Sequence, residues 1–283
     1  MLVFNSKTEL TVFLKSQNSE NESVGFIPTM GALHSGHMSL IENSLKNNTI
    51  TVVSIFVNPT QFNNSDDLKK YPRTLDTDIE KIKKISDKVI IFAPSVEDIY
   101  NKSVKSTSFN FDGLENQMEG KHRPGHFDGV GTIVKKLFEI INPNNAYFGE
   151  KDFQQLQIVK KMVEKENLTV NVIGCEILRE PNGLAMSSRN ERLSKESREK
   201  ASLIYNFLKR TKDLFKNKSA QEISKIAEKN FKNNNDFELE YFEICDEEKL
   251  LPCLRKNKTK KYRAFIAVYV EGVRLIDTIS LSE

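Results

Sequence analysis

Two histidines three residues apart, His34 and His37, stand in the segment PTMGALHSGH at 28–37. A short apolar run at 24–27 precedes this segment, and apolar residues with helical spacing follow it. This order predicts a strand, a glycine-containing turn, and a helix whose first turn carries both imidazoles. Backbone N–H groups and the positive end of a helix dipole attract anions at such a position. We therefore expect a phosphate to bind there. The alternative is a turn whose histidines are solvated or bonded to backbone carbonyls.

A second polar cluster, FVNPTQF at 56–62, follows the apolar run at 50–56. Asn58 and Gln61 stand just past the end of this expected strand. An amide side chain both donates and accepts hydrogen bonds, so it can bind hydroxyl and carboxylate groups together. We expect the two residues to hold a substrate. A plain Asn–Pro turn is the alternative interpretation.

A third junction between a strand and a helix is YFGEKDFQQ at 147–155, which places Lys151, Asp152 and Gln155 in the first helical turn. Asp152 suits a helix start and could simply cap it. A lysine is unfavourable beside the positive end of the helix dipole. Lys151 therefore indicates that an anion such as a phosphate shares the site.

Two further segments are rich in groups that bind anions. The segment EGKHRPGHF at 119–127 combines two glycines, a proline and four groups able to carry positive charge, which predicts a mobile, anion-attracting loop. A solvated basic loop would have the same composition. In LAMSSRN at 184–190, two hydroxyls and Arg189 could wrap a polyphosphate and stabilise charge on a leaving group. Ser188 could instead cap a helix.

These polar segments fall between elements that alternate along the first 175 residues or so. Such alternation predicts βαβ units and a mostly parallel sheet of the α/β class, which binds ligands beyond the carboxyl ends of its strands. The expected strands are 24–27, 50–56, 89–93, 146–148 and 169–174, and the expected helices are 38–46, 74–85, 129–141 and 153–166.

The pattern changes after about residue 179, where two charged amphipathic stretches precede three β-rich runs. This pattern predicts a smaller α+β domain, and we place the domains at 1–178 and 179–283. The dipeptide Glu271-Gly272 predicts a tight hairpin between the last two strands. The expected helices are 195–216 and 220–232, and the expected strands are 238–245, 262–270 and 273–280.

The composition is that of a globular protein with a core, since 38% of the 283 residues are hydrophobic and 29% are charged. The net charge of +3 does not favour wholesale binding to nucleic acid. No apolar run approaches the roughly 20 residues that span a bilayer, and we expect a cytoplasmic protein. The three scattered cysteines favour reduced thiols and make no zinc pattern with the histidines.

Taken together, the segments resemble the pantoate–β-alanine ligase (pantothenate synthetase) family of the H-x-G-H nucleotidyltransferase superfamily. The H-x-G-H signature is shared by several adenylyltransferases and indicates only the class. The other segments, in this order, are much more specific to this one family. The resemblance runs through PTMGALHSGH, FVNPTQF, KHRPGHFDGV, YFGEKDFQQL and GLAMSSRN.

The resemblance implies a Rossmann-like first domain, a smaller lid domain and a reaction in two steps. ATP and (R)-pantoate would first give a bound pantoyl adenylate and pyrophosphate. The amine of β-alanine would then attack the acyl carbon and release pantothenate and AMP. Mg²⁺ would accompany ATP, with no carboxylate cage for it in the protein. The family also suggests a homodimer.

The resemblance implies a role for each matching residue. His34 and His37 would donate to phosphates during attack at the α-phosphorus, with His37 the proton donor, and Lys151 would lie at the phosphates. Gln61 and Gln155 would grip pantoate, and Arg123 and His126 would lie near the substrate entrance. The residues implied at the nucleotide are Met30, Gly31, Ala32, Leu33, His34, Ser35, Gly36, His37, Gly149, Glu150, Lys151, Asp152, Leu178, Met186, Ser187, Ser188 and Arg189.

Three alternatives remain open at this point. Another H-x-G-H adenylyltransferase would transfer AMP to a phosphate acceptor and would not need paired glutamines. A nucleic-acid-binding protein would use the basic stretch 255–263, which is more typical of a solvated loop between strands. A catalytically inactive scaffold would lack polar positions that this chain retains.

Overall fold

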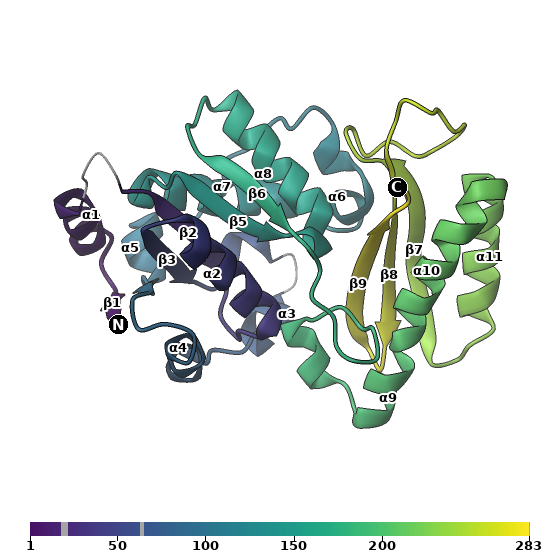
Figure 1. Ribbon diagram of the computed structural model, residues 1–283, viewed down its shortest axis with the longest axis horizontal. Helices are drawn as coiled ribbons and strands as arrows, with labels where there is room; N and C mark the ends of the chain where they lie inside the picture. The colour runs from purple at the N-terminus through teal and green to yellow at the C-terminus, as the bar shows by residue number, and fades with distance from the viewer. Residues whose placement is uncertain (18–21, 63–64, 283) are drawn as a thin grey trace. The chain divides into compact units, whose positions relative to one another are not determined.

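The computed structural model describes residues 1–17, 22–62 and 65–282 (Figure 1). The chain forms two compact units. The N-terminal unit comprises residues 1–115, 119–149 and 155–175. The C-terminal unit comprises residues 116–118, 150–154 and 176–283.

A six-stranded parallel sheet forms the N-terminal unit, with strand order β1-β4-β3-β2-β5-β6. This sheet confirms the predicted α/β class. All five predicted strands are present to within two or three residues at their ends. The strands are β1 (Leu2–Phe4), β2 (Val24–Thr29), β3 (Ile50–Ile55), β4 (Ile90–Phe92), β5 (Asn145–Gly149) and β6 (Asn171–Cys175).

Helices connect these strands, and the four predicted ones are present. The α-helices of this part of the chain are α1 (Lys7–Ser16), α2 (Ser35–Asn47), α3 (Ser65–Lys70), α4 (Leu75–Lys83), α5 (Val96–Tyr100), α6 (Met118–His122), α7 (His126–Ile141) and α8 (Phe153–Lys165). The short 3₁₀ helices are η1 (Pro59–Gln61), η2 (Leu114–Asn116) and η3 (Glu150–Asp152).

The strand order reverses at β2, which has β3 on one side and β5 on the other. Parallel sheets bind ligands in the crevice at the carboxyl ends of strands on either side of such a reversal. The histidine segment leaves β2 at this edge, and the amide segment leaves β3 beside it. The topology therefore places both predicted segments at one edge of the sheet.

Buried side chains of α2, α4 and the central strands form a core on one face of this sheet. Leu33, from the turn after β2, is 1% exposed and belongs to this core. The turn is therefore anchored by an apolar side chain. The other buried members are Ile27, Leu40, Ile41, Val53, Ile82, Val89, Ile91, Tyr147 and Cys175.

The C-terminal unit is an antiparallel sheet of order β7-β8-β9 with α10 and α11 packed along it (Figure 1). This sheet confirms the predicted α+β pattern. The predicted hairpin joins β8 to β9, with positive φ angles of 53° and 70° at Glu271 and Gly272. The elements are η4 (Ser188–Arg192), α9 (Lys195–Lys200), α10 (Ser202–Asn217), α11 (Ala220–Lys232), β7 (Phe237–Asp246), β8 (Tyr262–Val270) and β9 (Val273–Ser280).

Two elements at the amino terminus were not predicted. Strand β1 has only three residues, too few to show an alternating pattern. Helix α1 did carry a signal, because Ser6 stands three residues before Glu9, as in a capping box. The Ser6 hydroxyl accepts a hydrogen bond from the Glu9 N–H at 3.4 Å.

The prediction of one continuous helix over 195–216 was wrong near its amino-terminal end. The chain divides at Ala201 into α9 and α10. Ala201 is completely buried, and the Ser202 hydroxyl donates to the Glu199 carbonyl at 2.7 Å. Local side-chain bonds of this kind compete with regular helix bonds.

The prediction of a loop over 119–127 was also wrong. Residues 118–122 form α6, and α7 already begins at His126. Gly125 has φ 79° and lets the chain turn sharply between the two helices. Proline and glycine therefore mark a tight helix–helix turn here and not a long loop.

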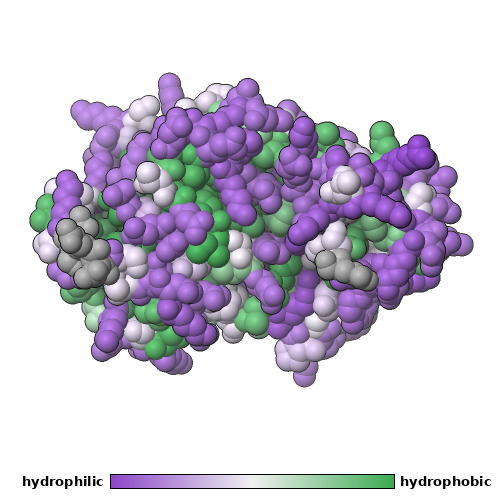
Figure 2. Space-filling model, turned by 45° about the horizontal axis from the view of Figure 1, so that its top comes forward, coloured by the Kyte–Doolittle hydropathy of each residue, from purple (hydrophilic) through white to green (hydrophobic). Residues whose placement is uncertain are grey.

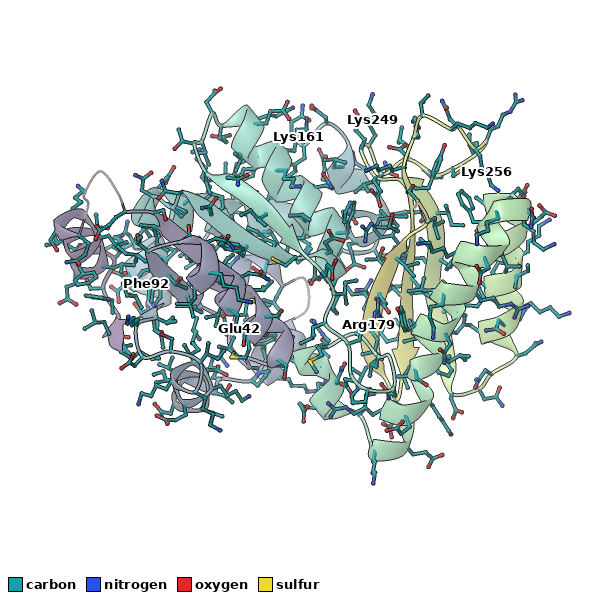
Figure 3. All side chains as sticks on the ribbon, viewed as in Figure 1. Glu42, Phe92, Lys161, Arg179, Lys249 and Lys256 are labelled. Carbon is teal, nitrogen blue, oxygen red and sulfur yellow. The ribbon has the colours of Figure 1, made fainter. Side chains whose placement is uncertain are left out.

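Most of the molecular face in Figure 2 is hydrophilic, as the charged fraction of 29% predicts. The basic segment between β7 and β8, where Figure 3 labels Lys249 and Lys256, is largely exposed over 254–261. At its end Tyr262 and Arg263 are buried in β8. Within the described residues, no helix is both long enough and apolar enough to cross a membrane.

Candidate active site

His34 and His37 form a reciprocal cap at the start of α2. The Gly36 N–H donates to His34 Nδ1 at 3.1 Å, and the His34 N–H donates to His37 Nδ1 at 3.3 Å. The ring centroids are 4.0 Å apart. Two histidines thus take the parts that serine and glutamate play in an ordinary capping box.

This geometry indicates which tautomer each neutral ring adopts. A nitrogen that accepts a backbone N–H carries no proton, so each neutral imidazole holds its proton on Nε2. In this tautomer Nε2–H is the donor group of each ring. The cap also uses the Gly36 N–H, so this part of the predicted backbone cradle for phosphate is already bonded within the protein.

The turn before the histidines is held by the protein itself. The N–H groups of Ala32 and Leu33 donate to the two carboxylate oxygens of Asp78 at 2.9 and 2.8 Å. Asp78 lies in α4 and is 0% exposed. This residue could not be predicted from the sequence, because nothing local in the chain links position 78 to position 32.

Gln61 is the centre of a polar cluster after β3. Its Nε2 lies 3.0 Å from Met30 Sδ, and its Oε1 accepts from Asn58 Nδ2 at 3.1 Å. The Nδ1–H of His126 donates to the Gln61 carbonyl at 2.8 Å. The structure therefore brings together four residues that the sequence assigned separately to nucleotide and substrate.

Asn58 is 1% exposed, and its amide is bonded on both sides by the protein. The Asn58 Oδ1 accepts from the Tyr100 hydroxyl at 2.6 Å and from the Thr60 hydroxyl at 3.1 Å, while Nδ2 also donates to the Gly129 carbonyl at 3.1 Å. Burial raises the pKa of Tyr100, which keeps its hydroxyl a donor. These bonds make Asn58 a support for Gln61.

Helix α7 approaches this cluster very closely. A Cβ built on Gly129 would lie 2.3 Å from the Thr60 carbonyl oxygen, so only glycine fits. His126, in the first turn of α7, is 6% exposed and therefore part of the packed cluster. Arg123 lies at the end of α6, with its NH1 3.5 Å from the Glu119 carboxylate.

Gln155 lies in the first turn of α8 and is partly exposed. Its neighbour Gln154 is buried and donates to the Gln117 carbonyl at 2.8 Å. Adjacent glutamines thus have different surroundings. Gln154 stabilises the fold through this hydrogen bond, and Gln155 is the glutamine that the family resemblance assigns to pantoate.

In the C-terminal unit, η3 presents Lys151 between two acidic residues. The Glu150 carboxylate accepts from Arg263 NH2 at 3.0 Å, and the Arg263 guanidinium lies 4.0 Å from the centre of the Phe153 ring. The Lys151 Nζ is 3.9 Å from Asp152 Oδ2. Glu150 therefore anchors the turn to β8, a contact that no local sequence pattern predicts.

The predicted nucleotide residues from 178 onward belong to one small structure in the same unit. The Met186 N–H donates to the Leu178 carbonyl at 3.0 Å, closing a short hairpin. Ser187 caps η4 by accepting from the Arg189 N–H at 3.2 Å. The cap is therefore Ser187, and the alternative in which Ser188 caps this helix was wrong.

Arg179 fixes the base of this hairpin to strand β9 (Figure 3). Its guanidinium donates to both carboxylate oxygens of Asp277 at 2.6 and 3.0 Å, and it lies 3.6 Å from the centre of the Tyr205 ring. Asp277 is almost fully buried. Burial raises the pKa of Asp277, while the Arg179 guanidinium acts in the opposite direction.

The side chains of these residues offer hydrogen-bond donors of several kinds. The residues that the structure describes contain no group of three or more His, Cys, Asp or Glu that could hold a metal. Imidazole N–H, lysine and hydroxyl groups donate to phosphate oxygens.

A parallel sheet whose strand order reverses, with polar residues following the strands at that point, is typical of α/β nucleotide-binding proteins. Comparison with known proteins then gives the family. The family model for pantoate–β-alanine ligase matches residues 2–280, and the chain belongs to this family.

Similar proteins cover the whole chain. It is 63% identical over 281 residues to the pantothenate synthetase of Flavobacterium psychrophilum, covering 99% of this chain and 100% of the relative. The crystal structure of pantothenate synthetase from Thermus thermophilus matches with a TM-score of 0.90 at 36% identity, covering 100% of both chains. That of the Francisella tularensis ligase, complexed with β,γ-ATP and β-alanine, matches with a TM-score of 0.82 at 36% identity, covering 99% and 98%.

Proposed function

We propose that this chain condenses (R)-pantoate with β-alanine at the expense of ATP, releasing pantothenate, AMP and pyrophosphate. The observation that carries this proposal is the family match across residues 2–280, with 63% identity to a pantothenate synthetase over 281 residues. A phosphate acceptor in place of pantoate, the alternative left open by H-x-G-H, has no support in these comparisons.

The first step that we propose is attack of the pantoate carboxylate on the α-phosphorus of ATP. The bond between the α-phosphorus and the bridging oxygen breaks, and pyrophosphate leaves. The Nε2–H groups of His34 and His37 suit donation to phosphate oxygens as charge builds on them. His37 acts as the proton donor.

The second step is attack of the β-alanine amine on the acyl carbon of pantoyl adenylate. An amide bond forms, AMP leaves as the acyl–oxygen bond breaks, and the ammonium loses a proton. Holding the amine and the adenylate together supplies most of the catalysis. No covalent bond to the protein is required.

Gln61 and Gln155 bind pantoate in this proposal, and Gln61 also lies where β-alanine arrives. The support for Gln61 is its fixed position, since Asn58 and Met30 both contact its amide. Asn58 contributes by holding Gln61. Arg123 and His126 border the substrate through the same cluster.

ATP is bound, in this proposal, through three segments. Residues 30–37 provide the histidines, with Ala32 and Leu33 holding the turn. Residues 149–152 provide Lys151 for the phosphates and Asp152 for the ribose. Leu178 and 186–189 contact adenine and polyphosphate, and the hairpin that joins Leu178 to Met186 supports their acting together. ATP enters as its Mg²⁺ complex, with the metal on phosphate oxygens.

We further propose a cytoplasmic homodimer. Light scattering after size-exclusion chromatography tests the dimer. We expect a particle mass of twice the chain's 32.5 kDa. A mass of one chain at micromolar concentration contradicts it. Fractionation of the source cells tests the location.

Product analysis tests the proposed reaction. With ATP, Mg²⁺, pantoate and β-alanine, we expect equal amounts of pantothenate and AMP. Omission of either acid should abolish pantothenate formation. Release of ADP, or product formation without pantoate, contradicts the proposal.

A further inference from the structure

Two side chains of α4 bind the backbone of the turn that precedes the histidine pair. Asp78 accepts from the Ala32 N–H at 2.9 Å and from the Leu33 N–H at 2.8 Å. The Lys81 ammonium, one turn further along α4, donates to the Leu33 carbonyl at 2.6 Å. Both polar backbone atoms of Leu33 are therefore held by one helix.

The turn is shaped to receive the Asp78 carboxylate. Gly31 and Ala32 have positive φ angles of 83° and 51°, and the N–H groups of Ala32 and Leu33 converge on one carboxylate. Such a backbone concavity normally binds an anion. Here the anion is the protein's own carboxylate, and a Cβ on Gly31 would lie 3.1 Å from Asp78 Oδ2.

Asp78 is itself fixed in place. It is 0% exposed, and its Oδ2 also accepts from the Thr74 hydroxyl at 3.1 Å. The Leu33 side chain packs in the same core as Ile82 of α4. The turn thus has an apolar anchor and three hydrogen bonds to α4, although Ala32 holds a conformation that L-residues seldom adopt.

His34 follows directly after this held turn. Its ring caps α2 and its N–H binds the His37 ring, so the backbone at 32–33 sets where both imidazoles lie. We infer that Asp78 and Lys81 are positioning residues that hold the histidine pair for adenylation. This inference rests on the roles proposed above for His34 and His37.

Kinetics of isosteric variants test the inference. The variants are Asp78→Asn and Lys81→Met, with Asp76→Asn and Lys83→Met as controls of equal charge change on exposed positions of α4. In pantoate-dependent pyrophosphate exchange, Asp78→Asn should lower kcat about 10- to 100-fold, since a displacement near 1 Å is enough for such a loss. The KM for pantoate should stay within about threefold, and both controls should match the wild type.

A double-mutant cycle separates positioning from general stabilisation. If Asp78 acts through the histidines, Asp78→Asn should lower exchange less than about twofold in a His37→Gln background. Losses that multiply, or an Asp78→Asn variant as active as the wild type, overturn the inference. If Asp78→Asn does not fold, Lys81→Met takes its place in the same cycle and tests positioning against general stabilisation in the same way.

The hydrogen bonds of Asp78 and Lys81 to residues 32 and 33, here called the clamp, can be tested by amide hydrogen exchange without measuring activity. In the wild type, the N–H groups of Ala32 and Leu33 should be protected, and Asp78→Asn should speed their exchange about tenfold or more while β3 is unchanged. Equal protection in both proteins overturns the clamp. If the wild type shows no pantoate-dependent pyrophosphate exchange, the proposed function is contradicted. The clamp is still tested in that case, because amide hydrogen exchange does not depend on activity.

Discussion

At the scale of single residues, the chemistry depends on how a few side chains are bonded within the protein. The spacing of His34 and His37 predicted their shared place at a helix start. It could not predict that each ring accepts a backbone N–H at Nδ1, which depends on the exact turn. For Asn58, the partners Tyr100 and Gly129 are 42 and 71 residues away in the chain, so its full hydrogen bonding could not be predicted from its neighbours.

Replacing His37 tests its proposed role as donor. His37→Ala should lower the rate of adenylate formation about 10²- to 10⁴-fold, the range typical of proton transfer by a side chain. Circular dichroism should show an unchanged fold. His122→Gln, at an exposed position, is the control and should keep wild-type activity. Full pantoate-dependent exchange in a folded His37→Ala protein would rule the role out.

Replacing Gln155 tests the pantoate contact. Loss of hydrogen bonds to a charged substrate should raise the KM for pantoate about tenfold or more and leave the KM for ATP near the wild-type value. Gln157→Ala, two residues along α8, is the matched control. A change confined to the KM for ATP would show that the substrate assignment is wrong.

At the scale of elements, strands and helices with a regular apolar pattern could be predicted from the sequence. Features that depend on contacts between distant residues could not. Alternating apolar runs gave the five strands of the N-terminal unit, and β8 and β9 were predicted to the residue because a hairpin dipeptide separates them. The segment 119–127 was misassigned because Pro124 and Gly125 form a tight turn between two helices. Long-range partners, such as Arg263 for Glu150, leave no local pattern.

The packing of α7 on η1 gives a prediction at this scale. Gly129→Ala should lower the free energy of unfolding by about 1–3 kcal/mol and displace Gln61, since the added Cβ meets a backbone oxygen. Gly131→Ala, on the same helix, is the graded control, because its Cβ would lie 3.1 Å from phenylalanine ring atoms. Denaturant unfolding of both variants checks this. An effect of Gly131→Ala as large as that of Gly129→Ala contradicts the account.

At the scale of the whole molecule, each unit has its own hydrophobic core, and buried charged side chains within each unit hold its polar segments in place. In the C-terminal unit the buried pair of Arg179 and Asp277 ties the 178–186 hairpin to β9. The family match across 2–280 accords with a fold class that could be predicted from the order of elements alone.

Removing Arg179 should destabilise the C-terminal unit strongly. Arg179→Met leaves the Asp277 carboxylate buried without its cation, which lowers the free energy of unfolding by about 3–5 kcal/mol. Lys216→Met breaks an exposed pair with Asp213 and should change it by less than about 1 kcal/mol. Chemical denaturation at neutral pH measures both. Equal small losses would show that the buried pair is not needed for stability.

Pyrophosphate exchange into ATP without β-alanine tests the central claim most directly, because it isolates the adenylation that the histidine pair is proposed to assist. The account predicts that labelled pyrophosphate enters ATP when pantoate is present and not when it is omitted, and that β-alanine then releases AMP and pantothenate. Exchange supported by a mononucleotide or by phosphopantetheine, and not by pantoate, would contradict it.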